Sequence, residues 1–122
     1  MQQHPKVRAH IAALSPRDRI VICPIVRGEV LYGIERMPAG KKRRDLEVKA
    51  AHLFSAIPCE PILEGIADHY ARVKREVERK GTPLDENDLW IAATAQAMGA
   101  ILISSDEDFR KVSGLKLEDW TI

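Results

Sequence analysis

The sequence is poor in cysteine and histidine and lacks the glycine and serine motifs of several common enzyme classes. Its two cysteines, Cys23 and Cys59, form no Cys-x-x-Cys pair, and its four histidines show no zinc-ligand spacing. No Gly-x-Ser-x-Gly motif and no phosphate-binding glycine loop follows an apolar run. Zinc sites, serine hydrolases and glycine-loop nucleotide sites therefore have no support, and we expect both cysteines to be buried, reduced thiols.

Long apolar runs and an excess of one charge are also missing. No stretch approaches the roughly 20 apolar residues that span a bilayer, and residues 1–6 lack the apolar core of a secretion signal. We therefore expect a cytoplasmic protein with no membrane partner. With 19 Lys and Arg against 18 Asp and Glu, the formal net charge of +1 gives no general attraction to polyanions, so nucleic-acid binding must come from local patches.

The spacing of apolar residues predicts helices that alternate with short strands. Strands separated by crossover helices indicate an α/β fold, in which a parallel sheet carries helices on both faces. The length favours one domain over residues 1–122. Helices are predicted over about 7–14, 26–36, 41–55, 62–80 and 86–98, and strands over 20–23, 100–104, 115–117 and, more weakly, 56–59.

Four carboxylates follow the predicted strands or begin a predicted helix. Glu29 comes shortly after the strand at 20–23, Asp106 and Asp108 directly follow the strand at 100–104, and Asp88 lies in the first turn of the helix at 86–98. Because ligands of an open parallel sheet bind beyond the carboxyl ends of its strands, we expect these side chains to converge.

Each of these carboxylates also has an ordinary structural interpretation. Asp85 is suited to be a helix N-cap, Asp88 favours the first turn, and Asp106 is suited to cap a short helix at 107–112. Crowding favours a functional interpretation, because like charges at a few ångströms repel unless a cation neutralises them. Carboxylates without a histidine or cysteine cluster suit Mg²⁺, with Mn²⁺ as an alternative, and indicate phosphodiester hydrolysis.

The two acidic stretches carry a resemblance to a known family. Asn87-Asp88-Leu89-Trp90-Ile91-Ala92-Ala93, followed by Leu102-Ile103-Ser104-Ser105-Asp106-Glu107-Asp108-Phe109, is similar to the PIN-domain ribonucleases, nearest to VapC-type toxins of type II toxin-antitoxin modules. The resemblance covers nearly the whole chain and includes a glutamate at the position of Glu29. It implies a three-layer PIN-like fold.

The resemblance also implies an activity and a set of site residues. The chain would be an Mg²⁺-dependent endoribonuclease with Glu29, Asp88 and Asp106 as catalytic metal ligands. Asp108 would be an auxiliary carboxylate, and Asn87 and Ser104 would support the site through hydrogen bonds. The implied partners are an RNA substrate, a cognate VapB-like antitoxin and a second copy in a homodimer.

One part of the family pattern has no counterpart in this sequence. Family members begin with a central strand that ends in a metal-binding aspartate, whereas the only aspartate before Ile20 is Asp18, in a polar segment. We therefore expect the first strand to be missing from this chain. Two interpretations follow. Either Met1 is a misplaced start and the native protein is a normal ribonuclease, or the chain is a catalytically inactive, truncated PIN domain that acts as an antitoxin-binding module. A third reading is a plain α/β domain whose carboxylates only cap helices.

Overall fold

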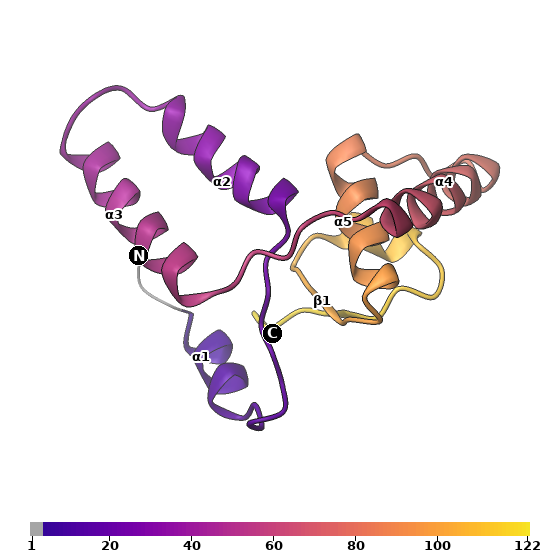
Figure 1. Cartoon of the computed structure of the whole chain (residues 1–122), viewed down its shortest axis with the longest axis horizontal. Coiled ribbons are helices and arrows are strands. Elements are labelled where there is room, and N and C mark those ends of the chain that lie inside the picture. The colour runs from indigo at the N-terminus through magenta and orange to yellow at the C-terminus, as the bar shows by residue number, and fades with distance from the viewer. Residues whose placement is uncertain (1–3) are drawn as a thin grey trace. The chain divides into compact units, whose positions relative to one another are not determined.

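The computed structural model describes residues 4–122, which form two compact units (Figure 1). One unit is Pro16–Pro61, and the other combines residues 4–15 with Ile62–Ile122. Five α-helices and a small parallel sheet make up the regular structure of the described residues, so the predicted α/β class holds. None of the described helices is long and apolar enough to cross a membrane.

The Pro16–Pro61 unit is built on two helices in contact, α2 (Pro24–Glu35) and α3 (Lys41–Ala56). α2 starts two residues before the predicted boundary, because a proline at the first helical position gives up no hydrogen bond. The Arg27 guanidinium lies 4.3 Å from the Phe54 ring centroid, and Arg43 pairs with both Glu35 and Glu47. The charge of Arg43 is thus balanced by neighbouring acids.

The strands predicted at 20–23 and 56–59 are reduced to a single parallel bridge between Ile22 and Cys59. The Ile22 amide donates to the Pro58 carbonyl, and the Glu60 amide donates to the Ile22 carbonyl, both at 2.9 Å. The helix α3 continues through Ala56, which leaves little chain for a second strand. Cys23 is buried but Cys59 is exposed, so the prediction of two buried thiols is wrong for Cys59.

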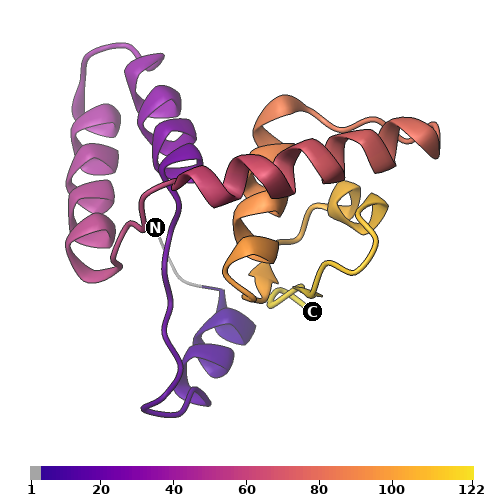
Figure 2. The ribbon, with the colours of Figure 1, turned by 45° about the vertical axis from the view of Figure 1, so that its right-hand side comes forward.

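In the other unit, α1 (Pro5–Ala12) precedes the contacting pair α4 (Glu64–Arg79) and α5 (Glu86–Ala97) (Figure 2). Predicted apolar positions on α4, among them Val73 and Val77, are buried. α5 has buried residues on more of its surface than α4, and its alanines Ala92 and Ala93 are completely buried. Small side chains at these positions allow close approach of neighbouring elements, which is why α5 forms the centre of this unit.

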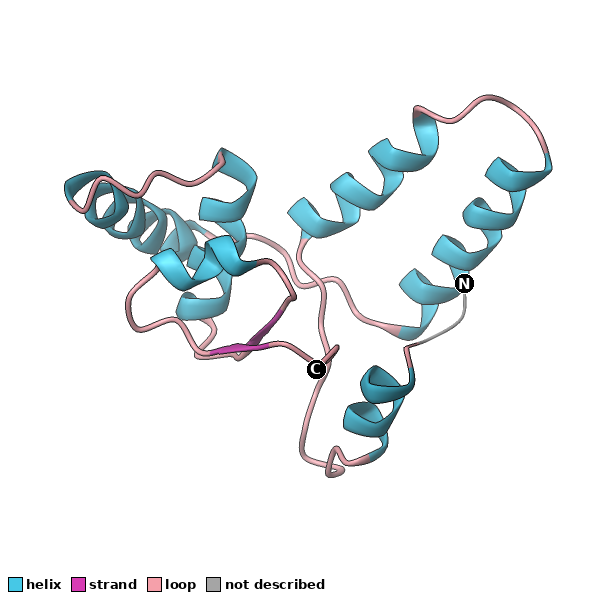
Figure 3. Ribbon diagram, turned by 180° about the vertical axis from the view of Figure 1, so that it is seen from behind, coloured by secondary structure: helices cyan, strands magenta, loops and turns pink. Residues whose placement is uncertain are grey.

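The sheet of this unit consists of two parallel strands, β1 (Leu102–Ile103) and β2 (Leu117–Glu118) (Figure 3). Leu102 lies opposite Leu117, and Ile103 lies opposite Glu118. Both strands were predicted, but β1 is shorter than the predicted run at 100–104. A 3-10 helix, η1 (Glu107–Lys111), stands at the predicted position of the short terminal helix. The broad sheet with helices on both faces is therefore realised only in part.

A sharp reversal joins α5 to β1. Gly99 has φ of +62°, in the left-handed region that glycine adopts without strain, and the Ala100 amide donates to the Ala95 carbonyl at 2.9 Å. The chain therefore turns back on itself directly after the helix. As a result, the end of β1 returns toward the level of the first turn of α5.

Candidate metal centre

Three carboxylates gather where the first turn of α5 meets the segment after β1. Each of Asp88, Asp106 and Asp108 places one carboxylate oxygen within 4.8 Å of the other two. Asp88 is half-buried, and the other two are exposed. The predicted convergence of Asp88 with Asp106 and Asp108 is thus what the structure displays.

Asp88 is positioned by the packing of its own helix. The next residue, Leu89, is only 2% exposed, and Trp90 stacks on Tyr70 of α4. Asp85 occupies the N-cap position of α5, but its side chain makes no capping hydrogen bond. The prediction of Asp85 as the N-cap residue is therefore confirmed, and its carbonyl accepts the Leu89 amide at 3.0 Å.

Asp106 is held by a pair of short-range hydrogen bonds. The Ser104 hydroxyl accepts the Asp106 amide at 3.1 Å, and Asp106 Oδ1 accepts the Asp108 amide at 2.9 Å. The capping interpretation of Asp106 is confirmed, but it does not compete with metal binding. A carboxylate has about four lone-pair sites, and one amide occupies one of them.

The donor set fits a small hard cation. Mg²⁺ is usually held in proteins by one or two carboxylates and several waters, so Asp88, Asp106 and Asp108 would hold such an ion between them. Only oxygen ligands are offered, which disfavours a softer metal. Lys111 Nζ lies 3.3 Å from Asp108 Oδ1 and offsets part of the negative charge of this carboxylate.

Asn87 and Glu29, also predicted as site residues, are not among the three grouped carboxylates. Asn87 is exposed in the first turn of α5, and its side chain makes no hydrogen bond within the described residues. Glu29 is exposed on α2 and belongs to the Pro16–Pro61 unit, so its role as a ligand stays a prediction.

A tyrosine and a lysine hold Glu86 at the start of α5. The Tyr70 hydroxyl donates to Glu86 Oε1, and Lys74 Nζ lies 3.2 Å from Glu86 Oε2. The Tyr70 hydrogen bond, followed by that from Lys74, lowers the pKa of Glu86. The pKa of Lys74 is raised by its hydrogen bond to Tyr70 and by Glu86. This network links α4 to the helix turn that carries Asp88.

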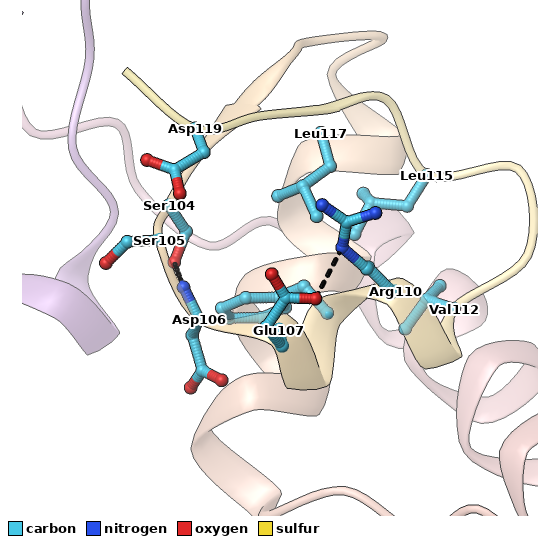
Figure 4. Close-up of a pocket in the computed structure, with 10 residues that line it drawn as sticks. Ser104, Ser105, Asp106, Glu107, Arg110, Val112, Leu115, Leu117 and Asp119 are labelled. Atoms are coloured by element: carbon cyan, nitrogen blue, oxygen red, sulfur yellow. Dashed lines mark hydrogen bonds and ion pairs between the residues drawn. The ribbon is translucent and has the colours of Figure 1, made fainter. Parts of the chain in front are cut away.

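Sequence reasoning missed a cavity of about 320 Å³ that shares Asp106 with the cluster (Figure 4). Asp119 and Arg110 line it. Thr121 donates its amide at 2.8 Å and its hydroxyl at 2.5 Å to Asp119 Oδ1, and these bonds lower the pKa of Asp119. The rule that drew attention to Asp106 would also have found Asp119, because it directly follows β2.

Comparisons with known proteins identify the family of this chain. Residues 2–115 match the family described as the PIN domain. Ribonuclease VapC1 of Haemophilus influenzae strain R2866 is 29% identical over 124 residues, which cover 99% of this chain and 90% of that protein. The tRNA(fMet)-specific endonuclease VapC of Salmonella typhimurium is 29% identical over 104 residues, covering 84% of this chain and 76% of that protein.

Solved structures give the same result at the level of the fold. VapBC-1 from nontypeable Haemophilus influenzae has a TM-score of 0.86 at 25% identity, over 96% of this chain and 86% of that one. VapBC2 from Rickettsia felis, bound to a DNA fragment from its promoter, has a TM-score of 0.83 at 27% identity, over 93% of this chain and 84% of that one. With the matching acidic motifs and the family match over most of its length, this chain belongs to the PIN domain family.

Proposed function

We propose that this protein is a VapC-type toxin of a type II toxin-antitoxin module, an Mg²⁺-dependent endoribonuclease that hydrolyses RNA phosphodiester bonds. The observation that carries the proposal is the meeting of Asp88, Asp106 and Asp108 within 4.8 Å. The names of the relatives, ribonuclease and endonuclease, support the reaction class.

The residues have separate tasks in this proposal. Asp88 and Asp106 hold the metal, joined by Glu29, and Asp108 is the auxiliary carboxylate. A bound Mg²⁺ supplies charge stabilisation at the phosphate and lowers the pKa of a bound water. Ser104 holds the loop through the Asp106 amide, which keeps that carboxylate in place as substrate approaches. Asn87, exposed beside Asp88, is available to hydrogen-bond the RNA or a water.

The proposal includes partners. The similar solved structures are VapBC complexes, which supports a VapB-like antitoxin as the cognate partner of this chain. An antitoxin that covers the acidic cluster would block access of RNA. We also propose a homodimer and action on RNA in the cytoplasm, as the family resemblance implies.

The test replaces one carboxylate without changing its shape. Asp88→Asn should abolish Mg²⁺-dependent cleavage of a mixed RNA substrate, because the amide loses the charge that binds the ion. Asp68→Asn, an exposed change of the same kind on α4, is the matched control and should cleave at the parental rate. Unchanged cleavage by Asp88→Asn would remove the proposed role of Asp88.

The competing function is an inactive PIN domain that binds antitoxin. If the parental chain cleaves no RNA at any Mg²⁺ concentration yet binds the antitoxin encoded beside it, that function replaces the enzymatic one. The absence of any heat on titration with Mg²⁺ or Mn²⁺ would instead favour a plain α/β domain whose carboxylates are structural.

A further inference from the structure

The cavity beside the acidic cluster has a composition of its own. Its apolar wall contains Leu115 and Leu117, which are half-buried, and the buried side chains of Phe109 and Val112. Ser104 and Ser105 also line the cavity, and Asp106 belongs to both the cavity and the acidic cluster. At about 320 Å³ it lies at the lower end of the size range of small-ligand sites.

The charges of this cavity exclude a phosphate as its occupant. Three carboxylates, those of Asp106, Glu107 and Asp119, line it against one guanidinium, that of Arg110. Arg110 is also paired with Glu107, with Nε 2.7 Å from Oε2. A second anion would be repelled here, whereas a neutral group rich in N–H donors would be attracted.

Asp119 is fixed as a hydrogen-bond acceptor. Both bonds from Thr121 fall on Oδ1, which orients the carboxylate and leaves Oδ2 without a hydrogen bond among the described residues. Figure 4 shows Asp119 and Arg110 on opposite sides of Leu117 in that view. The cavity thus offers an acceptor, a planar donor and an apolar wall between them.

A nucleobase next to the scissile phosphate meets these requirements. Proteins that recognise single-stranded RNA place bases on apolar or guanidinium surfaces and read the polar edges by hydrogen bonds. Guanine is the base that presents two neighbouring N–H donors on one edge and two acceptors, O6 and N7, on another. The donors suit Asp119 Oδ2, and the acceptors suit Arg110.

We propose that the cavity formed by Asp119, Arg110 and Leu117 is a base-binding subsite that selects guanine in the RNA strand beside the acidic cluster. The inference rests on the proposed function, because a nuclease site is what brings RNA to this surface. It names a specificity-determining residue, Asp119, that lies outside the metal-binding set.

The decisive experiment measures binding without cleavage. The four RNA trinucleotides UGU, UAU, UCU and UUU are titrated into the isotope-labelled chain in buffer containing EDTA, and backbone amide shifts are followed by NMR. UGU should shift the amides of residues 104–106 and 117–119 and bind on the order of tenfold more tightly than the other three. Asp119→Asn should reduce UGU binding to the level of UAU, because the amide preserves the Thr121 contact but places a donor or a neutral acceptor opposite guanine.

Two further variants keep the result interpretable. Arg110→Gln should weaken UGU binding without abolishing the shifts, and Asp68→Asn, remote in sequence and of equal charge change, should bind all four as the parent does. The dispersion of backbone amide signals in the NMR spectrum of each variant establishes that the variant is folded. Equal affinity for the four trinucleotides, shifts confined to other segments, or a guanine preference that survives Asp119→Asn would each overturn the subsite.

Cleavage of a randomised RNA pool separates this inference from the proposed function. Sequenced products should show guanine enriched at one position beside the cut, and Asp119→Asn should lose that enrichment while still cutting. If no variant and no parental protein cuts RNA but UGU still binds selectively, the nuclease assignment is wrong and the subsite stands. If the parent cuts without any guanine preference, the subsite is wrong and the nuclease stands.

Discussion

The phenol ring of Tyr70 on α4 stacks on the indole of Trp90 on α5, with ring centroids 4.0 Å apart and planes within 9° of parallel. Trp90 is two residues from Asp88, so the stack fixes the rotation of the helix turn that carries the half-buried carboxylate. The same tyrosine donates its hydroxyl to Glu86. The Tyr70 side chain thus joins two helices through one ring face and its hydroxyl.

Removing the stack should weaken this unit. Tyr70→Ala should lower the free energy of unfolding by about 1 to 3 kcal/mol, since an aromatic pair contributes about 0.5 to 1.5 kcal/mol beyond its buried area. Tyr70→Phe keeps the aromatic ring and should therefore retain most of the stability that Tyr70→Ala loses. Urea denaturation followed by tryptophan fluorescence measures both, and equal losses in the two variants would contradict a role for the stack.

The Glu86 network predicts a defined pH dependence. The pKa of Glu86 is lowered in the folded state by Tyr70 and Lys74, so its contribution to stability is present above the ordinary value of 4.5 and is lost as pH falls through the lower folded value. Glu86→Gln should therefore reduce stability at neutral pH, and the difference from the parent should vanish in strong acid. A difference that persists unchanged at low pH would show that the loss is due to packing.

The basic limb of the same profile comes from Lys74. Its pKa is raised in the folded state, so this contribution is complete below 10.5 and is lost as pH rises through the higher folded value. Lys74→Met should reduce the fall in Tm that the parent shows at alkaline pH. In a Lys74→Met background, Glu86→Gln should also lower Tm at neutral pH by less than it does in the parent. Arg75→Met, whose Glu78 partner lies 3.9 Å away on the same helix, is the control.

Metal binding should stabilise the folded chain. A ligand that binds only the folded state at 100 times its Kd adds about 2.7 kcal/mol, so saturating Mg²⁺ should raise Tm by several degrees. Asp106→Asn should remove most of this rise, because it weakens the cluster directly. Calcium-free buffers with graded Mg²⁺ and a calorimeter suffice, and a rise of equal size in Asp106→Asn would place the ion elsewhere.

Glu29 can be tested for the role that the family resemblance implies. Glu29→Gln should slow RNA cleavage by at least about 10- to 100-fold, because that range applies to residues that only support a metal ligand. Glu35→Gln, six residues further along the same helix and paired with Arg43 at 3.4 Å, is the matched control. Equal cleavage rates for Glu29→Gln and the parent would remove Glu29 from the site.

The buried centre of α5 gives a stability prediction with a clear magnitude. Leu89 is 2% exposed, and Leu89→Ala should cost about 2 to 5 kcal/mol of unfolding free energy, enough to unfold a marginal domain. Leu63→Ala changes the same atoms at a position that is 67% exposed. It should change stability by no more than about 0.5 kcal/mol. Chemical denaturation of both variants at one pH provides the comparison.

The helices could be predicted to within a few residues because their apolar spacing is a local property. Val73 and Val77 recur at the period of one helix face, and the φ of Gly81 is +70°, which ends the long helix where the sequence indicated. Strands were less predictable. Whether Ile22 or Ile103 extends into a ladder depends on a partner elsewhere in the chain, and no local pattern supplies that partner.

Part of the candidate site could be predicted, because the order of strands and helices along the chain determines which residues meet at the edge of the sheet. Asp88, Asp106 and Asp108 were found because strand ends and helix starts share an edge in parallel α/β folds. Asp119 directly follows β2 and was missed because the same rule was not applied to the last predicted strand, whereas the cavity it lines is set by packing and follows from no local pattern. The exposure of Cys59 was missed because a short apolar run does not specify what covers it.

The chain reverses at Gly99, between α5 and β1, and the acidic cluster lies at the opposite end of α5. Asp88 is near the start of this twelve-residue helix, which is about 18 Å long, and Asp106 follows β1. A tilt of the helix by about ten degrees at Gly99 would displace its first turn by roughly 3 Å, enough to separate the two carboxylates. The alignment of the two carboxylates therefore depends on uncharged, completely buried side chains such as Ala92 and Ala93, midway along the helix.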